Sequence, residues 1–195
     1  MATFMLSSLF LLLLICCATN STLVTSSEQS IDYLISSHTV SHAAVEKRSH
    51  FRFYWHDKIS GPNQTAVRVV DAPEFKKSIS TNFSDVYVFD DPLRTGPDKN
   101  SKLVGKAKGI YLEDGLYKIE LLVAMNFVFT DGKYNGSTIA VIGHNEVLTT
   151  VREMPIVGGS GLFRFARGYV QLRTYLYDQK TGYSVVEYNV FVNHY

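Results

Sequence analysis

The chain of 195 residues has very little cysteine, since only Cys16 and Cys17 are present and they are neighbours near its start. Both lie inside an apolar N-terminal segment that we interpret as a removable signal peptide, so we expect the mature protein to contain no thiol. This absence excludes a disulfide framework, a cysteine nucleophile and a cysteine-based metal site. A secreted domain without disulfides depends for its stability on its hydrophobic core, and on oligomerisation where that core is small.

An excess of charge of either sign is also missing. The 19 Lys and Arg residues are balanced by 18 Asp and Glu residues, which gives a net charge of +1 at pH 7. A balanced charge provides no electrostatic attraction for nucleic acid or for an anionic membrane, and we predict neither partner. With 46% hydrophobic, 13% aromatic and 19% charged residues, the composition is typical of one globular domain with a substantial core.

The N-terminus carries a short uncharged apolar run from Leu6 to Ala18. A membrane-spanning helix needs about 20 apolar residues, so this run is too short to span a membrane. It is typical of a secretory signal peptide, which we place at residues 1–18, followed by a flexible leader at residues 19–50 that is rich in Ser, Thr, His and Ala. Four glycosylation sequons agree with passage through the secretory pathway, at Asn20, Asn63, Asn82 and Asn135. We therefore expect a secreted glycoprotein of the extracellular space.

A helical period of useful length is absent from the sequence after residue 50. Alternating segments predict strands at residues 51–57, 65–70, 85–89, 102–112, 116–129, 137–142 and 183–192, with one more inside 152–175. Hairpin-type turn signals such as Asp131-Gly132 separate them. We place an all-β, antiparallel domain at residues 51–195, and closure into a barrel is the simplest way to leave no exposed strand edge.

The stretch from Arg152 to Tyr175 combines a glycine-rich segment with a long alternating run. Three glycines between positions 158 and 161 disfavour a helix and suit a turn with positive φ or a close approach of two backbones. We predict a turn there, followed by a strand that begins after Gly161. Small residues on one face of this strand and of the strand 102–112 are typical of a barrel with an internal cavity: Gly105, Ala107, Gly109, Ala166 and Gly168.

The common catalytic motifs are missing, because the sequence contains no nucleophile elbow, no His-Glu-x-x-His, no phosphate-binding loop and no dinucleotide fingerprint. The scattered histidines, His56, His144 and His194 among them, predict surface positions rather than a metal site, and we expect no metal and no cofactor. The remaining candidates are polar groups near strand ends: the pairs His56-Asp57 and Asp90-Asp91, and the residues Tyr111, Arg152 and Thr174.

These candidates allow two interpretations. A carboxyl group in an aromatic cavity has a raised pKa and can transfer a proton, and an arginine there can hold a phenolate or quinone oxygen. The same residue types are also common as ordinary surface and capping residues, and the pattern alone favours that second interpretation.

Five blocks of sequence resemble the plant dirigent family. They are Phe53-Tyr54-Trp55-His56-Asp57, Val88 to Leu93 (Val-Phe-Asp-Asp-Pro-Leu), Ser101 to Tyr111, Tyr134 to Thr138, and Val151 to Phe163 with Ala166-Arg167-Gly168. The resemblance covers Phe51 to Tyr195 and leaves the leader outside it.

That resemblance implies an eight-stranded antiparallel β-barrel, a homotrimer, and secretion to the apoplast. It also implies that the barrel binds a phenolic small molecule and oxidises nothing itself. A separate laccase or peroxidase makes phenoxy radicals from a monolignol such as coniferyl alcohol, and the dirigent protein sets the stereochemistry of coupling to an optically active lignan. By this resemblance Asp57 handles the proton of a quinone methide, Arg152 stabilises charge on its oxygen, and Tyr111 and Thr174 orient the substrate.

Two departures from the lignan-forming members bear on the product. Asn145 stands where those members carry a second aspartate, and an amide binds substrate but does not transfer a proton as a carboxyl group does. The mature chain also lacks their cysteine pair. Both features bring it closer to divergent branches that include the pterocarpan synthases, which dehydrate an isoflavanol through a quinone methide without any radical.

Three hypotheses for the function follow. The first is a stereo-directing protein for radical coupling of monolignols. The second is a lyase that dehydrates an isoflavanol and closes its ring. The third is a non-catalytic barrel that binds a phenolic compound or a glycan in the cell wall.

Overall fold

The computed structural model describes residues 45–71 and 81–195, which belong to one compact unit of the chain. The predicted signal peptide, nearly all of the predicted leader and the sequon at Asn20 lie outside the described residues. Among the described residues, no helix is long and apolar enough to cross a membrane.

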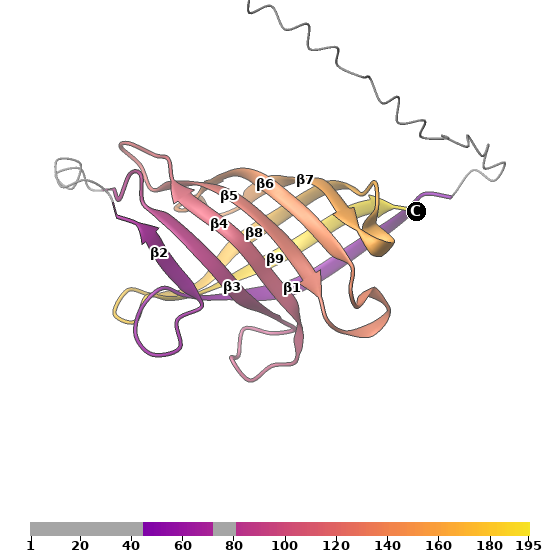
Figure 1. Ribbon diagram of the computed structural model, residues 1–195, viewed down its shortest axis with the longest axis horizontal. Helices are drawn as coiled ribbons and strands as arrows, with labels where there is room; N and C mark the ends of the chain where they lie inside the picture. The colour runs from indigo at the N-terminus through magenta and orange to yellow at the C-terminus, as the bar shows by residue number, and fades with distance from the viewer. Residues whose placement is uncertain (1–44, 72–80) are drawn as a thin grey trace, which may run out of the picture. The chain divides into compact units, whose positions relative to one another are not determined.

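In the described part of the chain, nine strands make up one antiparallel sheet (Figure 1). They are β1 (Lys47–Lys58), β2 (Ala66–Val70), β3 (Val86–Arg94), β4 (Leu103–Glu113), β5 (Glu120–Phe129), β6 (Thr138–Glu146), β7 (Arg152–Ser160), β8 (Arg167–Asp178) and β9 (Tyr183–His194). Two short 3₁₀ turns, η2 (Gly132–Tyr134) and η3 (Gly161–Phe163), connect β5 to β6 and β7 to β8.

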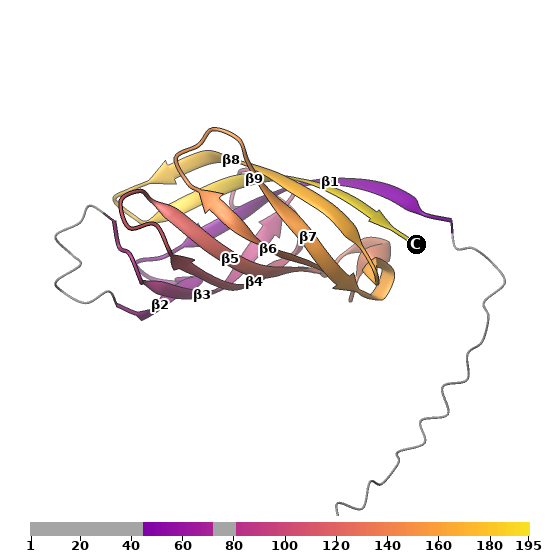
Figure 2. The same ribbon diagram turned by 90° about the horizontal axis from the view of Figure 1, so that it is seen from above.

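Strands β1 and β3 to β9 close into a barrel. Each of β3 to β8 pairs with the next strand along the chain, β9 pairs with β1 along its whole length, and β1 closes the ring by pairing with β3 at Trp55 and Leu93. Strand β2 pairs only with β3, at Val86 to Phe89, whereas β1 pairs with the other end of β3 at Leu93 and Arg94. Figure 2 shows β8 and β9 on the side of the barrel away from β3 and β4. The prediction of an all-β, eight-stranded antiparallel barrel is confirmed.

Alternate residues of each strand fill the interior, as the sequence pattern predicts. On β5 the buried residues are Val123, Met125, Phe127 and Phe129. On β4 the inward face carries the small residues Gly105 and Ala107 and then Tyr111. Only Tyr111 of these lines the cavity described below, so the small residues belong to the packed part of the interior.

Aromatic side chains fill one end of the barrel. Tyr134 from η2 and Phe163 from η3 have ring centroids 5.2 Å apart, and Phe51 packs edge-on against both, at 5.0 and 5.8 Å. Phe129 and His194 complete this cluster. The two 3₁₀ turns therefore close this end, and the strand ends opposite to it are left to form a cavity.

Four strand boundaries differ from the sequence prediction by four residues or more, and two of them are the start of β5 at Glu120 rather than at residue 116 and the end of β6 at Glu146 rather than at residue 142. β1 begins at Lys47, so the last four residues assigned to the leader form a strand. Their side chains are mostly exposed and polar, which hid the pattern, but their backbones pair with residues 191–194 of β9. The third strand does not end at Phe89 but continues through Pro92 to Arg94, with a register shift against β4 between Leu93 and Arg94.

The glycine-rich stretch also differs from its prediction. Gly158 and Gly159 lie within β7, and the turn is confined to η3, so the next strand starts at Arg167 rather than soon after Gly161. A Cβ on Gly159 would stand 2.4 Å from the carbonyl oxygen of Thr138 and 2.7 Å from that of Phe163. A close approach of backbones, rather than a wide turn, explains the glycine at that position.

Candidate functional site

The open end of the barrel contains a cavity of about 660 Å³. This volume lies within the range of about 300–1,000 Å³ that is usual for small-molecule sites. All five residues predicted from the sequence to act on or bind substrate line it: Asp57 on β1, Tyr111 on β4, Asn145 on β6, Arg152 on β7 and Thr174 on β8. The structure therefore brings together residues that are up to 117 positions apart, from Asp57 to Thr174.

Asp57 points into the barrel because it continues the inward alternation of Phe53 and Trp55 on β1. Burial raises the pKa of its carboxyl group to about 7, while hydrogen bonding from the Tyr111 hydroxyl and from the backbone N–H of Lys58 acts in the opposite direction. Its Oδ1 atom is buried without a hydrogen-bond partner among the described residues. Asp57 can therefore carry a proton near neutral pH and has an oxygen available for substrate.

Tyr111 forms the aromatic wall next to Asp57. Its ring stacks on Tyr87, with centroids 4.8 Å apart, and on Phe89 at 5.6 Å. Burial and the nearby carboxyl group of Asp57 raise the pKa of its hydroxyl well above the ordinary value, so the hydroxyl stays protonated and can donate. The stacked rings offer a flat surface to an aromatic substrate.

Arg152 places a cation on a different wall, three strands from β1 through β9 and β8. Its Nη1 atom donates to the Val147 carbonyl at 2.6 Å and to the Thr174 hydroxyl at 2.8 Å. Burial lowers the pKa of the guanidinium from its ordinary value, which is so high that the group remains charged. Its buried Nε–H has no acceptor among the described residues, so it can bind an oxygen of a ligand.

Asn145 on β6 pairs in register with Leu121 on β5, which in turn pairs with Glu113 on β4. These three residues therefore lie side by side across the sheet. The amide is 5% exposed, and its Oδ1 atom has no hydrogen-bond partner in the described part of the chain. An amide at this place can bind a hydroxyl group of a substrate. It cannot supply a second acidic proton.

Sequence reasoning missed three polar or aromatic residues of this region. Glu113 lines the cavity at its mouth, where its carboxylate accepts hydrogen bonds from the backbone and side chain of Asn82 at 3.1 and 3.2 Å. Tyr87 lines the wall beneath it. The third, Asp91, was named as a candidate only as part of a strand-end pair, and its place inside the barrel was missed: it lies fully buried on β3. The inward alternation of Tyr87, Phe89 and Asp91 along β3 was the available signal, but the strand was predicted to end at Phe89.

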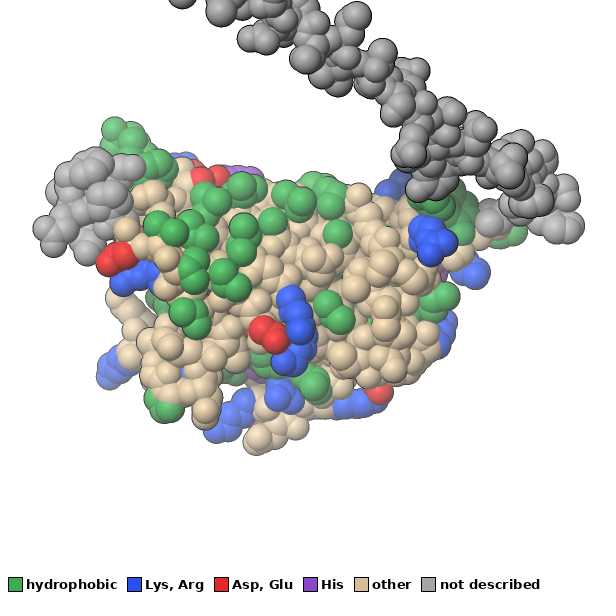
Figure 3. Space-filling view, viewed as in Figure 1, with side chains coloured by type: hydrophobic (Ala, Val, Ile, Leu, Met, Phe, Trp, Pro, Cys, Tyr) green, Lys and Arg blue, Asp and Glu red, His purple; other side chains and the backbone are tan. Residues whose placement is uncertain are grey.

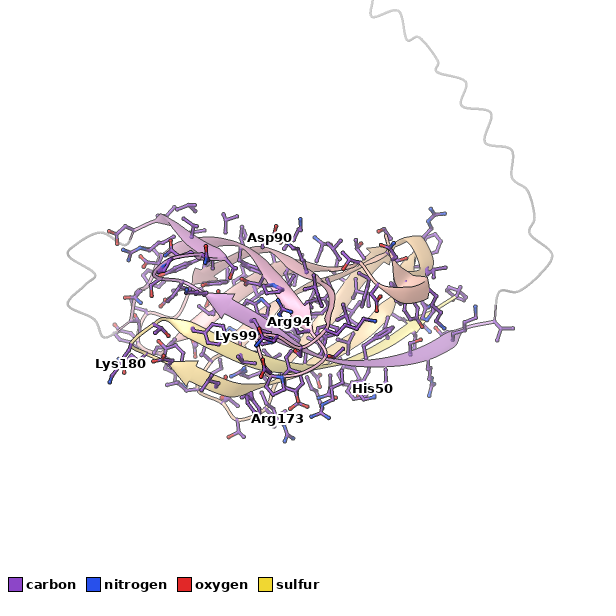
Figure 4. All side chains as sticks on the ribbon, turned by 90° about the horizontal axis from the view of Figure 1, so that it is seen from below. His50, Asp90, Arg94, Lys99, Arg173 and Lys180 are labelled. Carbon is purple, nitrogen blue, oxygen red and sulfur yellow. The ribbon has the colours of Figure 1, made fainter. Side chains whose placement is uncertain are left out.

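The other residue of each predicted pair, Asp90 and His56, lies on the outward side of its strand and away from the cavity. Asp90, labelled in Figure 4, faces the outside of the barrel and forms ion pairs with Lys106 at 3.1 Å and Lys108 at 3.4 Å. His56 is outside the cavity but is not a surface residue: it is 3% exposed and contacts the Tyr183 hydroxyl at 2.6 Å and the Gly96 carbonyl at 3.1 Å. His194 is buried as well, in the aromatic cluster, so the prediction of surface histidines is wrong for both.

Two further features of the described chain concern other predicted sites. No group of three His, Cys, Asp or Glu side chains within residues 45–71 and 81–195 is arranged to hold a metal ion. Asn63, Asn82 and Asn135 are all exposed, although the side-chain amide of Asn82 donates to Glu113 at the cavity mouth.

Comparison with known proteins relates this geometry to one family. A sequence model described as "Dirigent-like protein" matches residues 48–193. Dirigent protein 7 of Arabidopsis thaliana is 54% identical over 150 residues, which cover 77% of this chain and 78% of the relative. Pterocarpan synthase 1 of Glycine max is 48% identical over 151 residues, covering 77% and 81%. The solved structure of the pterocarpan synthase dirigent protein GePTS1 superposes with a TM-score of 0.73 at 43% identity, covering 79% of this chain and 88% of that one.

Proposed function

This chain belongs to the dirigent family, and we propose that its cavity binds a phenolic alcohol, dehydrates it to a quinone methide and directs the ring closure that follows. The observation that carries the proposal is a carboxyl group, Asp57, that is buried with its proton near neutral pH and shares one cavity with the guanidinium of Arg152. The acid can protonate the carbinol hydroxyl of such a substrate, and the fixed cation on another wall can bind its phenolate oxygen.

The proposed reaction assigns one task to each residue. The substrate binds as a phenolate whose oxygen accepts from Arg152, and its ring stacks against Tyr111. Asp57 gives its proton to the carbinol hydroxyl on the carbon conjugated to that ring, the carbon–oxygen bond breaks, and water and a neutral quinone methide are formed. A second phenolic hydroxyl of the same molecule then attacks that carbon and returns a proton to Asp57, which restores both the phenolate and the acid. Protons and electrons balance, and no oxidant is consumed.

Two observations favour this dehydration over a reaction that needs two acids. The second carboxyl position of the lignan-forming pattern is occupied by Asn145, which lines the same cavity and can orient a hydroxyl but not protonate it. Relatives whose names identify them as pterocarpan synthases are 48% and 44% identical to this chain. An isoflavanol with a free phenolic hydroxyl is accordingly the substrate class that we propose first.

Stereo-directed coupling of monolignol radicals is the second candidate. The observation in its favour is the aromatic lining of the cavity, where Trp55, Tyr87 and Tyr111 offer stacking surfaces for phenolic rings. In that case a laccase or peroxidase supplies the phenoxy radicals, and Arg152 with Asp57 positions their oxygens. The apolar and aromatic walls would then select the face on which two coniferyl alcohol radicals couple.

One set of incubations separates these functions. The purified protein is incubated with an isoflavanol alone, with coniferyl alcohol and an oxidase, and with each mixture lacking the protein, and the products are resolved by chiral chromatography. Pterocarpan formed without an oxidase supports the dehydration, and an enantiomeric excess of lignan only with the oxidase supports the coupling. Saturable binding of a phenolic compound or a glycan with neither product would overturn both and leave a non-catalytic binding role.

We also propose that the protein is secreted to the apoplast as a glycoprotein and assembles as a homotrimer. Exposed apolar residues support the assembly: Val88, Ile110 and Ile142 are between 41% and 47% exposed and lie in one row across β3, β4 and β6. Figure 3 shows apolar side chains gathered on this face of the barrel. Contiguous exposed apolar surface of this kind marks protein–protein contacts. Sedimentation equilibrium tests the assembly, and a monomer at micromolar concentration would overturn it.

A further inference from the structure

Asp91 is a buried carboxyl group that the proposed chemistry does not use. It is fully buried and is not among the residues that line the cavity. Thr65 and Trp55 are near enough to favour its charged form by hydrogen bonding, but neither of its oxygens has a partner within strict hydrogen-bond geometry among the described residues. An isolated carboxylate is expensive to bury, and a buried polar group without a partner calls for an explanation.

The position of Asp91 in the barrel relates it to Asp57. β1 and β3 pair in antiparallel register at Trp55 and Leu93, and continuing that register by two residues places Asp57 opposite Asp91. The strands separate there, and Thr65 occupies the gap: its N–H donates to the carbonyl of Lys58, and its carbonyl accepts from the N–H of Asp90. Both aspartates are on the inward faces of their strands, so their carboxyl groups are directed to the same part of the interior.

The groups around this pair are acidic or neutral. Burial is the main cause that raises the pKa of Asp91, to about 8, and the charge of Asp57 is the next, with a contribution from Asp90. Polar groups of Thr65 and Trp55 act in the opposite direction. The other titratable neighbours are Tyr87 on β3, Tyr111 on β4 and Tyr188 on β9, and burial with the nearby aspartates raises the pKa of each hydroxyl. Within the described chain, the one cation that acts on them from the cavity is Arg152, whose charge lowers the pKa of Tyr188.

We propose that Asp91 is a positioning residue for Asp57 and that the two carboxyl groups hold one shared proton at neutral pH. The proton is retained because its loss would leave two carboxylates facing each other in a buried site. In the proposed dehydration, which this inference deepens, the shared proton leaves through Asp57 to the departing hydroxyl. The attacking hydroxyl then returns a proton to the pair.

The neighbouring residue provides a matched control. Asp90 has the same side chain and the same strand, but it faces outward and its charge is balanced by Lys106 and Lys108. Replacing Asp90 by Asn therefore removes a carboxylate close to the site in sequence without removing a partner of the shared proton.

The pair is tested by ¹³C NMR titration of aspartate-labelled protein without substrate, in the wild type and in the variants Asp91→Asn, Asp57→Asn and Asp90→Asn. We expect the pair in the wild type to lose its two protons in two separate steps. In Asp91→Asn the upper step disappears and Asp57 titrates in a single step at least about one pH unit lower, a tenfold loss of proton affinity. Asp57→Asn has the reciprocal effect on Asp91, and Asp90→Asn leaves both steps in place. An Asp57 that titrates at the same pH in the wild type and in Asp91→Asn would overturn the inference.

Two further readouts keep the test decisive. If Asp91→Asn does not fold, the two-step titration of the wild type and the single step of Asp91 in Asp57→Asn decide the question. For folded variants, Asp91→Asn is expected to lower kcat about tenfold at pH 8 but little at pH 5.5, whereas a purely structural defect would lower it at both. Because the titration needs no substrate, a protein that turns over no isoflavanol would refute the proposed function and leave the shared proton to be judged by NMR alone.

Discussion

The guanidinium of Arg152 is held by Thr174, to whose hydroxyl oxygen its Nη1 atom donates at 2.8 Å. The same Nη1 atom donates to the Val147 carbonyl at 2.6 Å. These two acceptors fix the orientation of a buried cation before any ligand arrives, and they leave its Nε–H directed at no protein acceptor among the described residues. A donor that is already oriented costs no reorganisation when charge develops on a bound oxygen.

Replacing Thr174 by Val should therefore weaken catalysis without unfolding the barrel. The variant removes one acceptor of a charged donor, and such hydrogen bonds contribute about 1.5–3 kcal/mol, so kcat/KM should fall by about ten- to hundredfold. Steady-state kinetics with the substrate identified by the incubations measure the effect. Thr138→Val, which removes an exposed hydroxyl contact with Ser160, is the control. Equal kcat/KM in Thr174→Val and the wild type would show that Arg152 is positioned by other means.

Asp57→Asn should abolish the proton transfer and keep the cavity. The amide has almost the same size but cannot donate an acidic proton, so turnover should fall by about 10² to 10⁴. Affinity for an unreactive phenolic analogue, measured by calorimetry, should change by no more than a few-fold. Asp90→Asn should have full activity. A turnover of Asp57→Asn within tenfold of the wild type would remove Asp57 from the mechanism.

Tyr111→Phe should shift the pH profile to higher pH. The Tyr111 hydroxyl lowers the pKa of Asp57 by hydrogen bonding, so its removal leaves burial less opposed and raises that pKa further above 7. Asp57 then keeps its proton to higher pH, and the alkaline limb of kcat against pH should move upward. Tyr87→Phe, which keeps the stacked rings and does not hydrogen-bond to Asp57, should leave the limb in place. A downward shift in Tyr111→Phe would mean that the hydroxyl does not stabilise the carboxylate.

The sequence predicts the class of fold and much of the cavity because alternation along a strand is a local property. The inward faces of β4 and β5, for example, follow from residues two positions apart, and the presence of Tyr111 beside small residues follows from the same rule. The five predicted site residues were assembled through resemblance to a family, since no local pattern relates Asp57 to Arg152. The structure shows that they share a cavity.

Asp91 and His56 show what local patterns do not reveal. Alternation along β3 can indicate that Asp91 faces inward, but the closure of β1 on β3 joins segments nearly 40 residues apart, and no local pattern relates Asp91 to Asp57. Likewise, His56 is buried because Tyr183 and the carbonyl of Gly96 meet it from two distant parts of the chain. Burial on the outer side of a strand depends on which loops cover it, and that information is not contained in the alternation.

Stability should fall as the pH rises from about 5 to 8.5. The pKa values of Asp57 and Asp91, about 7 and about 8, lie above their ordinary value of 3.8, so the folded state binds more protons than the unfolded chain in this window. The free energy of unfolding therefore decreases with pH there, and it is largest below the window. A loss of 1 kcal/mol corresponds to about 2–4 °C in Tm for a chain of this size, so a decrease of several degrees is expected by calorimetry.

The double variant Asp57→Asn, Asp91→Asn isolates this effect. His56, whose pKa is lowered by burial, acts in the opposite direction at acid pH, but it contributes equally to both proteins. The difference in Tm between the double variant and the wild type should therefore grow in favour of the variant as the pH rises to 8.5. A difference that does not change with pH would contradict the raised pKa values of the two aspartates.

Gly159→Ala should destabilise the barrel strongly, because β7, β6 and η3 meet at this residue without space for a side chain. A Cβ there would stand 2.4 Å from the Thr138 oxygen, 2.7 Å from the Phe163 oxygen and 2.8 Å from the Phe163 Cβ. Two of these three atoms belong to backbone that is fixed by the sheet and by η3, so relief requires a shift of the strand rather than of a rotamer. Overpacking of this kind costs about 1–3 kcal/mol, and the upper end is expected here.

Gly96→Ala is the matched control, since its nearest contact would be the Ser101 Cβ at 3.4 Å, an ordinary van der Waals distance. Urea unfolding of the two variants measures the difference, and an equal free energy of unfolding for both would mean that β7 can move away from β6 at little cost.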